Sequence, residues 1–109
     1  MLMRPFHSES KNSMSSVSEE KKTRQRLAAR WRDVKREVQH LRSANTAELR
    51  ARYAGHLATA VDAYRRHVET LRGFADRWVD GGYVQPTVQA RHADERLKKL
   101  LAEHGLAEV

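Results

Sequence analysis

The six histidines are the side chains of this 109-residue sequence best suited to metal binding or proton transfer. No two of them lie four residues apart, the spacing that places two imidazoles on one side of a helix, and the HExxH motif is absent. His56 and His67 share one edge of a predicted helix but lie about 16 Å apart along it. The chain has no cysteine, so disulfides, thiolate nucleophiles and cysteine zinc sites are excluded. The sequence therefore predicts no metal site and no cofactor.

Catalytic motifs of other kinds are also missing. No glycine-rich phosphate loop occurs, and Gly81-Gly82 is interpreted as a turn. No motif places a nucleophile beside a general base, although residues distant in sequence can still meet in space. We therefore predict a protein that is not an enzyme, with a small helical enzyme as the third hypothesis.

Basic residues are the most prominent chemical feature of the sequence. Lys and Arg number 21 against 14 Asp and Glu, giving a formal net charge of +7. Most of the excess falls in residues 16–43, and on a helical wheel seven of those basic residues share one side without an acidic residue. A face of one sign predicts contact with a nucleic acid backbone or an acidic partner, and the alternative is a solvated face. These residues are Lys21, Lys22, Arg24, Arg32, Lys35, Arg36 and Arg42.

Aromatic side chains would allow bases to stack, but their spacing favours a place in the core. Four aromatic residues fall on regularly spaced apolar positions, and Phe74 borders one. The four are Trp31, Tyr53, Tyr64 and Trp78. With no exposed aromatic platform, nucleic acid binding is expected to follow the backbone and to tolerate any sequence.

The elements that must position these residues are helices. Alanine, leucine, arginine, lysine and glutamate dominate the composition, and no convincing alternation of apolar and polar residues predicts strands. We predict an all-α fold, with a long antiparallel helical hairpin and a shorter third helix. The predicted helices span residues 18–43, 45–80 and 86–104 of a single domain, 18–109.

The predicted helix ends rest on capping residues. Ser18 would cap the first helix, and Asn45 with Glu48 resembles a capping box for the second. Gly81-Gly82 would end the second helix, and Pro86 suits the first turn of the third.

Residues 1–18 hold six serines, and residues 1–17 show little periodic hydrophobicity. They are predicted to form a flexible or partner-held arm. Met14 would itself make an N-terminus, which leaves open that residues 1–13 are an upstream extension.

Large apolar residues recur at steps of three or four along the first two helices, which predicts a packing seam between them. The seam residues are Leu27, Trp31, Val34, Val38, Leu41, Leu49, Tyr53, Leu57, Val61, Tyr64, Val68, Leu71 and Trp78. An extended hairpin of this kind has a thin core, so self-association or docking on a protein partner is expected.

Small residues line the opposite side of the second helix and offer a second packing surface for another subunit. The alternative is a solvent face built from good helix formers. These residues are Ala47, Ala51, Ala54, Gly55 and Ala58.

Taken together, these features predict a non-enzymatic helical assembly or adaptor subunit whose basic first helix contacts a polyanion, foremost the backbone of nucleic acid. The alternative is a purely structural subunit of a viral particle or a secretion-type assembly. No stretch approaches the ~20 apolar residues of a membrane span, so a cytoplasmic location is expected.

Overall fold

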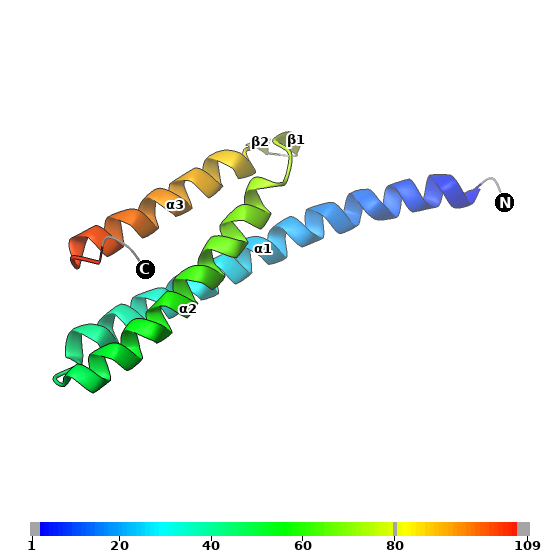
Figure 1. Cartoon of the computed structure of the whole chain (residues 1–109). Helices are drawn as coiled ribbons and strands as arrows, with labels where there is room; N and C mark the ends of the chain where they lie inside the picture. Colours follow the sequence, from blue (N-terminus) through cyan, green and yellow to red (C-terminus); the bar gives the residue numbers. More distant parts are fainter. Residues whose placement is uncertain (1–2, 80, 107–109) are drawn as a thin grey trace.

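The computed structural model describes residues 3–79 and 81–106, and in this part of the chain three helices dominate (Figure 1). The elements follow in the order α1 (Met3–Ser43), α2 (Ala47–Arg72), β1 (Arg77–Val79), β2 (Gly82–Val84) and α3 (Pro86–Glu103). The predicted all-α fold, two long packed helices and a shorter third, is confirmed.

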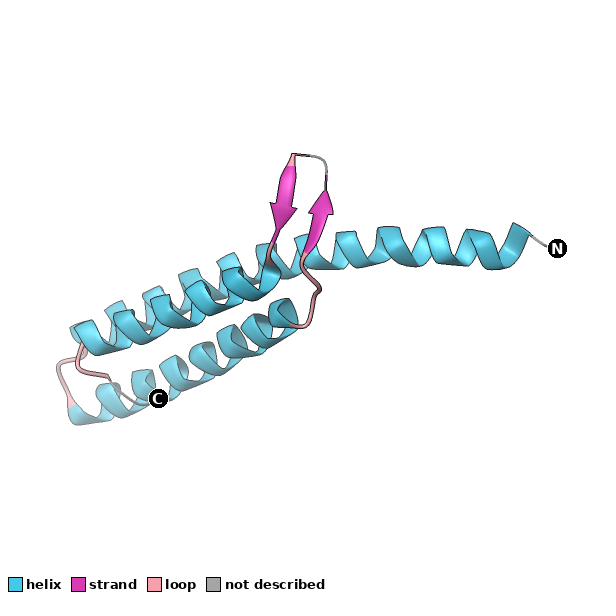
Figure 2. Cartoon of the chain, turned by 90° about the horizontal axis from the view of Figure 1, so that it is seen from above, coloured by secondary structure: helices cyan, strands magenta, loops and turns pink. Residues whose placement is uncertain are grey.

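The helix α2 is the centre of the fold, because both α1 and α3 pack against it. α1 and α2 form the antiparallel hairpin, and α3 returns along α2 (Figures 1 and 2). The result is an elongated molecule of 67 × 27 × 19 Å. No helix in the described residues is long and apolar enough to cross a membrane.

The helix α1 is longer than predicted. It begins at Met3, so Ser18 lies inside the helix and is not its N-cap. The only proline of this segment, Pro5, lies in the first turn, where its missing N–H costs no hydrogen bond. No glycine follows it before Ser18, so no helix breaker interrupts the chain. The flexibility predicted for residues 1–17 stays a prediction.

The N-terminus of α2 is capped one residue later than predicted. Thr46 has extended backbone angles, and its hydroxyl accepts a hydrogen bond of 3.1 Å from the backbone N–H of Leu49. Asn45 is therefore not the cap. Glu48 lies in the first turn of α2, where the helix dipole favours a negative charge.

The prediction that the second helix continues to residue 80 is wrong, because α2 ends at Arg72 and is capped by Gly73. The chain then forms an antiparallel hairpin in which Trp78 faces Tyr83. Gly81 lies between the strands and Gly82 begins β2, and their φ values of +97° and +143° are ones that residues with a Cβ rarely adopt. Short strands on either side of a Gly-Gly pair were missed because the three-or-four spacing continued through them.

The third helix agrees with its prediction to within one residue. Pro86 occupies its first turn and Gly105 follows it with a φ of +69°. The backbone N–H of Leu106 then donates to the carbonyl of Leu101 over 2.7 Å, which closes the C-terminal turn.

The predicted seam forms much of the core, with three exceptions. Eight seam residues are buried, and Trp31 and Leu41 are half-buried and pack against them. Leu49 and Tyr53 are half-buried but do not belong to the core. Trp78 lies on β1 and is 79% exposed, so its assignment to the seam is wrong. The buried hydrophobic residues are Leu27, Val34, Val38, Leu57, Val61, Tyr64, Val68, Leu71, Ala90, Ala93, Leu97 and Leu101.

The surface of small residues on α2 is open in this single chain. Ala47, Ala51, Ala54 and Gly55 are exposed, and Ala58 is half-buried. Its role as a second interface stays a prediction.

One titrating side chain at the contact between α1 and α2 gives a pH prediction. His67 is half-buried, and its pKa lies below the ordinary 6.5, first because of burial and then because of Arg30, Arg26 and Arg66. The unfolded chain therefore binds this proton more readily than the folded chain. The contribution of neutral His67 to folding stability is therefore complete above pH 6.5. It is lost as the pH falls toward the pKa of His67 in the folded chain.

We expect His67→Gln to flatten the fall in unfolding free energy between pH 7 and pH 5. Urea denaturation followed by circular dichroism at both pH values measures this fall. An equal fall in the variant and the parent protein would contradict the assignment to His67.

Candidate anion-binding groove

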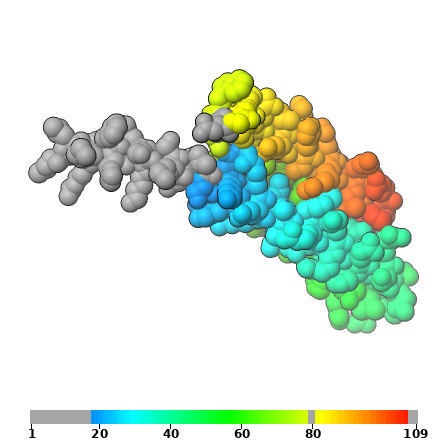
Figure 3. Space-filling model, turned by 180° about the vertical axis from the view of Figure 1, so that it is seen from behind, coloured from blue at the N-terminus to red at the C-terminus, as the bar shows by residue number. Residues whose placement is uncertain are grey.

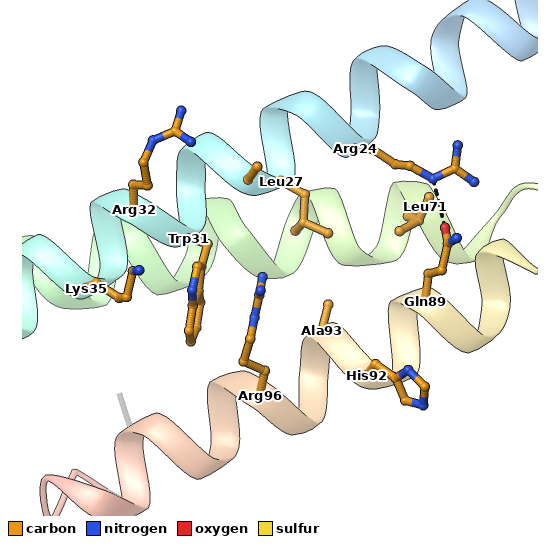
Figure 4. Close-up of a pocket in the computed structure, with 11 residues that line it drawn as sticks. Arg24, Leu27, Trp31, Arg32, Lys35, Leu71, Gln89, His92, Ala93 and Arg96 are labelled. Carbon is orange, nitrogen blue, oxygen red and sulfur yellow. Dashed lines mark hydrogen bonds between the residues drawn. The ribbon is translucent and has the colours of Figure 1, made fainter.

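The helices α1 and α3 both pack against α2 and leave a groove of about 590 Å³ between them (Figure 4). In the described chain the backbones of α1 and α3 stay apart, and only side chains reach across. The groove is lined by Arg24, Leu27, Ala28, Trp31, Arg32, Lys35, Leu71, Gln89, His92, Ala93 and Arg96.

The floor of the groove is apolar. Leu27 from α1, Leu71 from α2 and Ala93 from α3 are buried there and belong to the hydrophobic core. Small side chains at Ala28 and Ala93 keep the groove open, since longer ones would fill the space between the helices. Because these floor residues are buried in the core, they fix the helices that carry the polar side chains above them.

The rim of the groove is cationic. Four arginine and lysine residues and His92 contribute to its lining, and no aspartate or glutamate does so. Cationic side chains above a low-dielectric floor attract anions more strongly than the same charges dispersed in water. The four residues are Arg24, Arg32, Lys35 and Arg96.

Arg96 reaches from α3 across the groove to Trp31 on α1 (Figure 4). Its guanidinium carbon lies 4.0 Å from the centre of the Trp31 ring, and its Nη2 donates a hydrogen bond of 3.1 Å to the Tyr64 hydroxyl. That hydroxyl in turn donates to the carbonyl of Ala93 over 2.9 Å. Burial raises the pKa of Tyr64, so the phenol remains a donor. Arg96 is thus held in place with guanidinium N–H groups left for a ligand.

Two further cations on α1 flank this site. The Nζ of Lys35 lies 5.9 Å from the centre of the Trp31 ring, and in Figure 4 the ring stands between Lys35 and Arg96. Arg32 lies on the outer side of α1, away from α3, and extends the positive surface beyond the groove (Figure 4). Both residues are exposed, so both can meet a large anion without a change in the fold.

Arg24 closes the other end of the groove. Its Nε donates a hydrogen bond of 2.8 Å to Oε1 of Gln89 on α3 (Figure 4). Its Nη2 pairs with Oε1 of the fully buried Glu20 at 2.5 Å. The second oxygen of Glu20 pairs with Arg77 of β1, so one carboxylate joins α1, the hairpin and the groove. Part of the Arg24 charge is therefore compensated.

The predicted basic face of α1 is less uniform in space than on the helical wheel. Lys22 pairs with Glu19 at 3.6 Å, and Arg36 pairs with Asp33 and Glu37 on the other flank of the helix. Together with Arg24, three of the seven predicted residues thus have carboxylate partners. Among the described side chains, no carboxylate lies within 4.0 Å of the other four. These are Lys21, Arg32, Lys35 and Arg42.

Three groove residues of α3 were missed in the sequence analysis. Gln89, His92 and Arg96 stand among pairs of opposite charge on α3, such as Lys98 with Asp94, and nothing local marks them as part of a site. Only the packing of α1 and α3 on a common neighbour brings them together with Lys35. The spacing of these residues at three and four, typical of one helix face, was the one available signal.

The opposite flank of α1 has a different chemistry. Glu37 is buried, and its two oxygens lie 3.3 Å from Nδ1 of His40 and 3.7 Å from Nδ1 of His56. The ring of Tyr53 packs against both imidazoles, with centroid distances of 5.1 and 5.8 Å. In the described residues no group of three or more His, Cys, Asp or Glu side chains could hold a metal ion. The cluster therefore joins α1 to α2 through polar contacts.

An exposed aromatic pair lies on the hairpin, contrary to the prediction that the aromatic residues pack in the core. Trp78 is 79% exposed and Tyr83 is 45% exposed. Their ring centroids lie 5.0 Å apart at an interplanar angle of 43°. The aromatic platform that the sequence analysis excluded is thus present on the surface.

Comparisons with protein-family models, with curated proteins and with solved structures gave no match to this chain. Any functional conclusion therefore rests on the groove and on the surfaces beside it.

Proposed function

We propose that this protein is a non-enzymatic helical adaptor or assembly subunit that binds the phosphate backbone of nucleic acid in the groove between α1 and α3. The observation that carries the proposal is that Arg24, Lys35 and Arg96 meet at one groove that no carboxylate lines, with Arg32 extending the positive surface beside it. Guanidinium groups suit phosphate because their planar N–H groups match two phosphate oxygens at once.

The dimensions of the groove favour an extended anion over a single small one. From Arg24 to Lys35 the cations follow α1 over about 16 Å, at a rise of 1.5 Å per residue. They come from two helices, so they can contact successive phosphates along a strand. Contacts to phosphate fix the position of a nucleic acid but carry no sequence information, so binding of DNA and RNA of any sequence is expected.

Reversing two groove charges tests the proposal. If four cations neutralise four phosphates, the affinity falls about 100-fold between 50 and 200 mM salt. We expect Arg32→Glu/Lys35→Glu to weaken binding at least about tenfold and to lower the salt slope by about two. Both residues are exposed, so the fold is retained. Fluorescence anisotropy of a labelled oligonucleotide over this salt range measures both effects.

The matched control is Arg52→Glu/Arg65→Glu, which makes the same change in net charge on exposed residues of α2 that do not line the groove. A groove-specific site predicts that the control variant loses clearly less affinity than the groove variant. Equal losses would assign binding to the net charge alone. Absent or salt-independent binding to DNA and RNA alike would contradict the proposal.

The alternative is a purely structural subunit of a larger protein assembly. The elongated shape and the exposed aromatic pair favour this reading, because both leave apolar surface for a second chain to cover. A protein that forms multimers in light scattering and binds neither DNA nor RNA would support it.

A further inference from the structure

The pair Trp78 and Tyr83 is the large apolar surface that the fold leaves open in the described residues. The other aromatic residues of this part, such as Trp31, Tyr64 and Phe74, are buried or half-buried. The pair faces across the two strands of the hairpin, and the φ angles are positive at Gly81 between the strands and at Gly82 at the start of β2. The rings are therefore presented on a defined scaffold.

The hairpin stands at the Arg24 end of the groove. Arg77 of β1 pairs with Glu20, whose other oxygen pairs with Arg24, and β2 leads directly into α3. Side chains alternate along a strand, so Trp78 and Tyr83 lie on the hairpin face opposite to Arg77 and α1. Figures 2 and 3 show the hairpin projecting beyond the helices, beside the surface where α1 and α3 are both visible.

We infer that the ligand is single-stranded nucleic acid, whose bases stack on Trp78 and Tyr83 while its phosphates follow the cationic groove. This inference rests on the proposed function and specifies the form of nucleic acid. In a duplex the base faces are covered by neighbouring bases, whereas a single strand offers them to aromatic side chains. Stacking tolerates any sequence because every base has a π face, which agrees with a groove that contacts only phosphate.

The charge beside the rings favours a single strand over an apolar protein segment. The groove begins at Arg24, which shares the carboxylate of Glu20 with Arg77 of the hairpin, and it also holds Arg96 and Lys35. The phosphates of a strand extending from the rings along this groove would replace water as partners of the cations. An apolar segment would leave these charges without partners. The combination of rings and cations is the recognition chemistry of single-strand binding surfaces.

The test compares Trp78→Ala/Tyr83→Ala with the parent protein on a labelled single strand and on a duplex of the same length. We expect the single-strand affinity to fall about tenfold, the duplex affinity to stay unchanged, and the salt slope to stay as in the parent protein. Trp78→Phe/Tyr83→Phe should restore most of the single-strand affinity, because it restores the rings. Circular dichroism verifies that the helices are retained.

The outcomes separate this inference from the proposed function. If the alanine variant binds the single strand as tightly as the parent while Arg32→Glu/Lys35→Glu weakens binding, stacking is refuted and the groove proposal stands. Equal losses on single strand and duplex would also overturn stacking. A multimer that dissociates in the alanine variant, with unchanged single-strand affinity, would assign the rings to a protein interface.

Discussion

Replacing Leu97 with alanine is expected to destabilise the protein by about 3 kcal/mol, within the usual range of about 2–5 kcal/mol for such changes. Leu97 is fully buried in the core between α3 and α2. Two of the other buried positions of α3 are Ala90 and Ala93, and Leu97 and Leu101 are its two fully buried leucines. The alanine variant leaves a cavity at one of them.

Urea denaturation followed by circular dichroism measures the loss of stability. Lys99→Ala is the matched control, because Lys99 is exposed on the same helix and its change is expected to stay within about 0.5 kcal/mol. Because α3 forms one wall of the groove, the Leu97 variant should also lose oligonucleotide affinity as α3 detaches. A loss of less than about 1 kcal/mol would show that α3 is held by other contacts.

The helical part of the fold follows from periodicity because burial needs one continuous apolar stripe. The steps of three and four from Leu27 to Leu71 place those side chains on facing sides of α1 and α2, where eight of the twelve are buried and four are half-buried. The same rule failed at Trp78, where the spacing continues but Gly73 has already ended the helix. Three-residue strands are too short for a period-two pattern, so only the Gly-Gly pair marked the turn.

The groove was predictable in part. Arg32 and Lys35 carry their signal locally, because both lie on the basic side of one helix. Arg96 and Gln89 do not, because their place in the site depends on how α3 packs on α2. Glu20, the carboxylate partner of Arg24, lies four residues before it, and this spacing is visible in the sequence. The burial of Glu20 is not, because it depends on the hairpin that packs over Glu20.

The buried carboxylate of Glu20 leads to the second prediction of a large loss of folding stability. Glu20 is fully buried and lies seven residues before Leu27, on the same face of α1. Arg24 and Arg77 compensate its charge. We expect Arg24→Ala/Arg77→Ala to cost about 3–5 kcal/mol, because it leaves an uncompensated charge in the interior. The exposed pairs of Arg66 with Asp62 and Arg72 with Glu69 provide the control.

Two further variants separate the buried charge from the mere loss of two arginine side chains. Arg66→Ala/Arg72→Ala also removes two arginines from two ion pairs, but these are exposed, so it should cost less than about 1 kcal/mol in all. Adding Glu20→Met to Arg24→Ala/Arg77→Ala removes the stranded charge and places an apolar side chain on the seam. Replacing a buried ion network with apolar residues is often neutral or stabilising, so most of the lost stability should return. Urea denaturation measures the stability of the three variants. A triple variant as unstable as Arg24→Ala/Arg77→Ala would mean that the two arginines act through packing and not through charge.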